Sequence, residues 1–79
     1  MAHRLPILSS KQIIKALKKA GFEYAPKRGK GSHIALFKID EKNVKRLVIV
    51  PKSKNIPKGT CLSIIDQAGL NKDEFLKLL

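Results

Sequence analysis

The fold is decided by residues 32–50, which read SHIALFKIDEKNVKRLVIV. Two runs rich in Ile, Leu, Val and Phe, at 32–39 and 45–50, flank a polar segment at 40–43. Branched and aromatic residues favour strands, whereas Asp and Asn favour turns. The stretch therefore predicts an antiparallel β-hairpin.

A shorter strand is expected before this hairpin, at residues 22–25. Pro26 follows it, and because proline cannot donate a hydrogen bond to a β-ladder, we place this strand at an edge of the sheet. Residues 27–31, KRGKG, form the turn into the next strand, since their two glycines permit positive φ. The prediction is three antiparallel strands joined by hairpins.

A helix is predicted before the strands. Ser9 and Gln12 have the spacing of a capping box, and Gly21 is suited to the C-terminal end. The apolar residues between them recur at helical spacing, namely Ile13, Ile14, Leu17 and Ala20.

Two helices are predicted after the strands. Pro57 suits a first helical turn, and Gly69 ends that helix. Asn71 and Glu74 form a second capping box, which opens a short helix through Leu79. The order α-β-β-β-α-α defines an α+β fold, which we expect to be a single domain over residues 1–79.

Apolar residues occupy both faces of the predicted sheet. Helices that follow a three-stranded antiparallel sheet can cover one face. On the second face, loops could cover the apolar residues at the edges. Alternatively, the face stays exposed as an apolar patch surrounded by charged residues, which would be a protein interface. Both interpretations stay open.

The composition fits one small domain. The chain has 79 residues, of which 43% are hydrophobic, so it can build a core and is not a disordered basic tail. The single cysteine, Cys61, excludes an internal disulfide and a multi-thiolate zinc site, and it is most simply a core residue. No apolar run is long enough to cross a membrane and no secretory leader is recognisable, so we expect a cytoplasmic protein.

The positive charge is concentrated in one part of the sequence. The formal net charge is +11, and residues 1–58 hold 15 basic against three acidic residues, a net of +12. A one-sided field of this strength favours a polyanionic partner, although a merely solubilising lysine surface is the alternative. Among the lysines of the first helix, we assign Lys18 and Lys19 to a solvated face and leave Lys11 and Lys15 open between a solvated face and a basic ridge.

His33 is the candidate for chemistry. It follows the most basic turn of the chain, Lys27, Arg28 and Lys30, and imidazole gains and loses a proton near neutral pH. Beside cations that hold a phosphodiester, it could take the 2′-hydroxyl proton of RNA or protonate the leaving 5′-oxygen. Ser32 would then cap the backbone or donate to a phosphate. On pattern alone, a structural role for a lone strand histidine stays open.

The sequence lacks the residues that other classes of enzyme require. Two histidines and six scattered acidic residues show no metal-ligand spacing, so we expect RNA cleavage without a protein-bound metal and without a cofactor. No carboxylate is spaced to complete a triad with Ser32 and His33.

Motifs along almost the whole chain resemble the HicA-type toxins of HicA–HicB toxin–antitoxin pairs. No single motif is specific, but their order and separations are. They are Leu5-Pro6, Ser9-Ser10-Lys11, Leu17-x-x-Ala20-Gly21-Phe22, Gly31-Ser32-His33, Leu47-Val48-Ile49-Val50-Pro51, Lys58-Gly59-Thr60, Ile64-Ile65-x-x-Ala68-Gly69-Leu70 and Glu74-Phe75-Leu76.

The resemblance implies a double-stranded-RNA-binding-domain-like fold and a metal-independent ribonuclease that cleaves mRNA. The family's active histidine corresponds to His33. It also implies a HicB-type antitoxin partner that covers the active site, for which charge would speed the encounter and apolar burial would hold the complex.

This sequence departs from the family pattern after Pro51. The family often carries a further basic or histidine-containing stretch there, whereas this chain reads Lys52-Ser53-Lys54. Lys52 and Lys54 would therefore stabilise charge rather than transfer protons. Two alternatives to the nuclease stay open: a non-catalytic RNA-binding domain that uses the same surface, and an interaction module whose basic surface binds an acidic protein.

Overall fold

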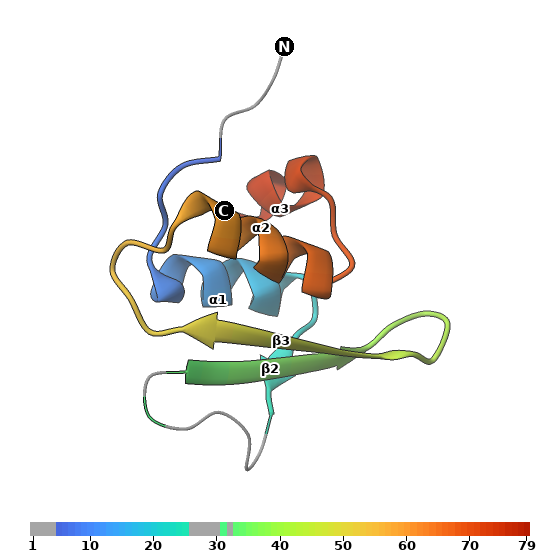
Figure 1. The fold of residues 1–79 in the computed structure, drawn as a ribbon. Helices are drawn as coiled ribbons and strands as arrows, with labels where there is room; N and C mark the ends of the chain where they lie inside the picture. The colour runs from blue at the N-terminus through green and yellow to red at the C-terminus, as the bar shows by residue number, and fades with distance from the viewer. Residues whose placement is uncertain (1–4, 26–30, 32) are drawn as a thin grey trace.

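The fold is that of a computed structural model, which describes residues 5–25, 31 and 33–79 (Figure 1). The elements are α1 (Ser10–Lys19), β1 (Glu23–Tyr24), β2 (His33–Ile39), β3 (Lys45–Pro51), α2 (Lys58–Gln67) and α3 (Lys72–Leu78). All three helices lie on the same side of the sheet in Figure 1. The predicted α-β-β-β-α-α order and the one-sided, double-stranded-RNA-binding-domain-like layering are confirmed.

Both ends of α1 follow the local rules that predicted them. The Ser9 N–H donates to Gln12 Oε1 at 2.9 Å, and the Gln12 N–H donates to Ser9 Oγ at 3.3 Å, which completes the capping box. Gly21, at φ +100°, reverses the chain after the last turn. The Phe22 N–H then donates to the Leu17 carbonyl at 3.0 Å, as expected where a glycine ends a helix.

The sheet has the order β1-β2-β3, and β1 is an edge strand as predicted. β2 and β3 pair over seven residues each, from His33 opposite Pro51 to Ile39 opposite Lys45. The first strand is shorter than the predicted 22–25. Phe22 is not part of it, because the Phe22 N–H is used by the end of α1 and the Phe22 side chain is buried in the core. Pro26 lies outside the described residues.

The core lies between the helices and one face of the sheet. The buried side chains of that face are Leu36, Val48 and Val50. Phe75 of α3 is 0% exposed and is among the largest fully buried side chains. α3 is therefore held to the rest of the molecule by an aromatic anchor.

The second face of the sheet is only partly covered. Ile39 is 50% and Ile49 is 37% exposed, whereas Phe37 is half-buried and the Lys45 Nζ lies 5.4 Å from the centroid of its ring. Ala35 on the same face is buried, so this face carries both buried and exposed apolar side chains.

The C-terminal helices begin and end close to the predicted residues. Pro57 is the N-cap of α2 rather than its first helical residue, and Gly69 follows its end at φ +73°. The capping box of Asn71 and Glu74 is present at the start of α3. Within the part of the chain that the structure describes, no helix has the length and apolar character needed to cross a membrane.

Candidate nucleic-acid interface

His33 is exposed at the first position of β2. The antiparallel register sets it opposite Pro51, so the chain that leaves β3 passes close to it. His33 lines a concavity of about 280 Å³ at this end of the sheet, together with Tyr24, Ile34 and Lys52. The structure therefore brings a titratable ring and a cation to one hollow.

Lys52 is positioned by hydrogen bonds between the loop after β3 and the first turn of α1. The Ser10 N–H donates to the Ser53 carbonyl at 2.9 Å, and the Ser53 N–H donates to Ser10 Oγ at 3.2 Å. These bonds join residues 43 positions apart. They place the backbone of the adjacent Lys52 near the N-terminus of α1, and the Lys52 side chain is exposed.

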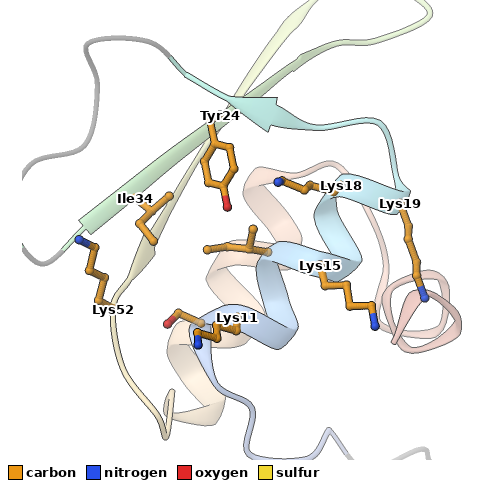
Figure 2. Close-up of a pocket in the computed structure, with 9 residues that line it drawn as sticks. Lys11, Lys15, Lys18, Lys19, Tyr24, Ile34 and Lys52 are labelled. Atoms are coloured by element: carbon orange, nitrogen blue, oxygen red, sulfur yellow. The ribbon is translucent and has the colours of Figure 1, made fainter.

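A larger groove, with a volume of about 880 Å³, lies between α1 and the β1–β2 part of the sheet (Figure 2). Its apolar surface comes from Ile14, Ile34 and the ring of Tyr24. Five lysines and no acidic residue line it, namely Lys11, Lys15, Lys18, Lys19 and Lys52. In Figure 2 the side chain of Lys18 points toward Tyr24, whereas those of Lys15 and Lys19 point away from it. The groove thus combines an apolar floor with a cationic rim.

Tyr24 joins the larger groove to the His33 concavity. Its ring points from β1 toward α1 in Figure 2, and the residue is 53% exposed. The Lys18 Nζ lies 4.1 Å from the ring centroid, a distance at which an ammonium is attracted to the aromatic face. Tyr24, Ile34 and Lys52 line both hollows, so the two form a continuous surface.

Other cations of the sheet are engaged in structural contacts. The Lys38 Nζ donates to the Ala20 carbonyl at 2.7 Å, at the end of α1. Arg46 Nε lies 3.3 Å from Asp40 Oδ2. We therefore do not assign these two residues to the interface.

The predicted site residues are described in part. The structure brings Lys52 to the His33 concavity and leaves Lys54 exposed two residues further along the loop. The remaining predicted contacts lie outside the described residues, namely Lys27, Arg28, Lys30 and Ser32. Tyr24 was not predicted as a site residue.

Two further features concern chemistry. Cys61 is fully buried, and burial raises the pKa of its thiol, as expected for a core residue and not for a nucleophile. Among residues 5–25, 31 and 33–79, no group of three or more His, Cys, Asp and Glu side chains could hold a metal ion.

Comparison with known proteins agrees with the motif resemblance. Residues 10–70 match the family described as the HicA toxin of bacterial toxin–antitoxin systems. This range contains α1, the whole sheet and α2, together with His33, Tyr24 and Lys52. No curated protein matches the chain. Because the match covers most of its length, the chain belongs to the HicA toxin family and is a toxin of a toxin–antitoxin system.

Proposed function

We propose that this toxin is a metal-independent endoribonuclease that cleaves mRNA in the cytoplasm, with His33 as its acid–base residue. The observation that carries the proposal is the position of His33, exposed at the end of β2 in a concavity that also contains Lys52. Family membership supplies the toxic role, and residues 1–79 would form one catalytic domain.

The reaction requires two proton transfers. The 2′-hydroxyl of the substrate loses its proton, and its oxygen attacks the adjacent phosphorus. The bond from phosphorus to the 5′-oxygen breaks, and that oxygen gains a proton. The products are a 2′,3′-cyclic phosphate and a 5′-hydroxyl. His33 would exchange the proton at one of these oxygens, a contribution typically worth about 10²–10⁴-fold in rate.

Cations would supply electrostatic stabilisation of the phosphorane-like transition state. Lys52 lines the His33 concavity, and its backbone is placed there through the adjacent Ser53, so its ammonium is suited to neutralise a phosphate oxygen. The other proposed RNA contacts are Lys27, Arg28, Lys30, Ser32 and Lys54. The proposed protein partner is a HicB-type antitoxin that covers this surface.

The test compares the native protein with His33→Ala on a defined, end-labelled RNA in EDTA. We expect the variant to lose at least about 100-fold in cleavage rate, with an unchanged circular dichroism spectrum and retained RNA binding. The matched control is His3→Ala, because His3 is the only other histidine of the chain. This control should cleave at the native rate.

The outcomes separate the alternatives. Equal cleavage by the native protein and His33→Ala would contradict the assignment of His33. Salt-sensitive RNA binding without any product would favour the non-catalytic RNA-binding domain. If His33→Ala does not fold, His33→Gln serves as the second variant. A His33→Gln protein that folds and cleaves RNA would exclude an acid–base role for His33.

A further inference from the structure

We propose that the groove between α1 and the β1–β2 part of the sheet binds the single-stranded RNA segment next to the cleaved bond, with one base on Tyr24. The proposal rests on the ribonuclease function proposed above and adds a substrate-binding subsite to it. The groove volume of about 880 Å³ lies within the range of sites that enclose a small organic group.

The charge of the groove favours a polyanion. Its five lysines face no carboxylate among the residues that line the groove. Lys11, Lys15 and Lys18 follow one another along one side of α1, over about 10 Å at 1.5 Å per residue. A single strand laid along this side of α1 would therefore pass more than one lysine.

The floor of the groove favours a base rather than a phosphate. Ile14 and Ile34 are apolar, and Tyr24 adds an aromatic ring that is 53% exposed. Proteins hold unpaired bases by stacking them on such rings, which contributes about 5- to 150-fold in affinity per base. The Lys18 ammonium, 4.1 Å from the ring centroid, is placed to bind the phosphate beside that base.

The connection to His33 sets the position of this subsite in the reaction. Tyr24, Ile34 and Lys52 line both the groove and the concavity of His33. A strand that leaves the groove past these residues enters the concavity. The base on Tyr24 therefore belongs to a nucleotide that flanks the cleaved bond.

The chain offers a direct spectroscopic test. Tyr24 is the only tyrosine and there is no tryptophan, so intrinsic tyrosine fluorescence reports this ring alone. We would titrate the full-length His33→Ala protein, which should not cleave, with a short oligouridylate. We expect saturable quenching of Tyr24, and no quenching by an abasic oligonucleotide of equal length.

Substitutions of Tyr24 separate stacking from charge. Tyr24→Leu should weaken binding of a labelled oligouridylate at least about five-fold, whereas Tyr24→Phe, which keeps the ring, should bind within about two-fold of the parent. In the active protein, Tyr24→Leu should raise KM with little change in kcat. Lys77→Gln, a change of an exposed lysine on α3, should alter neither quantity.

Failure of this inference is distinguishable from failure of the nuclease proposal. Native cleavage kinetics in Tyr24→Leu, together with no quenching of Tyr24 by oligouridylate in the His33→Ala protein, would overturn the subsite and leave the nuclease intact. Quenching by oligouridylate without cleavage by the native protein would support a base-binding groove and overturn the ribonuclease. Quenching by an acidic antitoxin segment but not by RNA would assign the groove to the protein partner and overturn the inference.

Discussion

Gly59 and Gly69 lie near opposite ends of α2 and experience opposite constraints. Gly69 has a φ of +73°, and a Cβ there would stand 3.1 Å from Arg46 Cζ. Gly59 has no heavy atom within 4 Å of the position of a Cβ and lies inside the helix. Gly69→Ala should cost about 1–2 kcal/mol through the left-handed backbone alone. Gly59→Ala should stabilise the protein by up to about 1 kcal/mol.

Thermal unfolding of the two variants checks this pair. For a chain of this size, each kcal/mol moves the Tm by about 4–8 °C. The Tm should therefore fall clearly for Gly69→Ala and stay equal or rise for Gly59→Ala. A fall of similar size in both would contradict the backbone argument.

Predictability at the scale of the residue depends on how local the interaction is. Ser9 and Gln12 are three residues apart, so their capping box is readable from the sequence and is confirmed. The role proposed for Tyr24 depends on Lys18 and Ile34, which only the folded chain brings around it. Lys18 follows Lys15 by three residues and Lys11 by seven, so the sequence places all three on one side of the helix. This spacing does not distinguish a solvent-exposed helix face from one that lines a groove.

The β2–β3 hairpin contains an element-level pH dependence. Asp40 Oδ1 accepts from the N–H groups of Lys42 and Val44, both at 2.9 Å, and Oδ2 lies 3.3 Å from Arg46 Nε. The hydrogen bond from the Val44 N–H is the largest cause that lowers the pKa of Asp40 below its usual 3.8. The folded state therefore prefers the ionised carboxylate.

The sign of the effect follows from this lowered pKa. The stabilisation of the folded state by the ionised Asp40 carboxylate is complete well above pH 4. It is lost as the pH falls through the folded pKa of Asp40. Asp40→Asn keeps an oxygen acceptor but cannot ionise. The native protein should have the higher Tm at pH 7, and the difference should disappear in strong acid. A difference that is constant from pH 7 to pH 2 would contradict the assignment.

Element boundaries were predicted less well than element types. Apolar spacing together with capping and turn residues identified every helix and strand. The three helices, β2 and β3 each bury apolar side chains in the core, whereas both residues of β1 are exposed. β1 begins at Glu23 instead of Phe22, because the N–H of Phe22 is taken by the Leu17 carbonyl of the preceding helix, and it ends at Tyr24 although the Ala25 N–H still donates to the Ala35 carbonyl at 2.9 Å. Such competition between neighbouring elements for one donor is not encoded in strand propensity.

At the scale of the whole molecule, the excess positive charge bears on where the proposed RNA substrate would bind. The sequence predicted a one-sided field, and the structure adds that α1 and the loop after β3 contribute lysines to the same groove. Their proximity depends on the Ser10–Ser53 hydrogen bonds, between segments distant in sequence. The pattern of residues in the sequence therefore could not predict that α1 and the loop after β3 line one groove.

This arrangement predicts a position-specific salt dependence of RNA binding. Each phosphate contact on a single strand contributes about −0.7 to the slope of log K against log salt. Replacing Lys11, Lys15 and Lys18 by Gln removes three of the lysines that line the groove and lowers the formal net charge from +11 to +8. The magnitude of the slope should therefore fall by about 2, as measured by fluorescence anisotropy with an uncleavable oligonucleotide.

A second triple variant separates the groove from the general field. Its three lysines are exposed on the hairpin turn, the second face of the sheet and α3, namely Lys42, Lys45 and Lys77. It carries the same formal net charge of +8, since it also loses three of the original 11 positive charges. Because these lysines lie away from the groove, the native slope should be retained. Equal slopes for the two triple variants would mean that RNA responds to the total charge of the protein, and the groove would lose its place as the path of the strand.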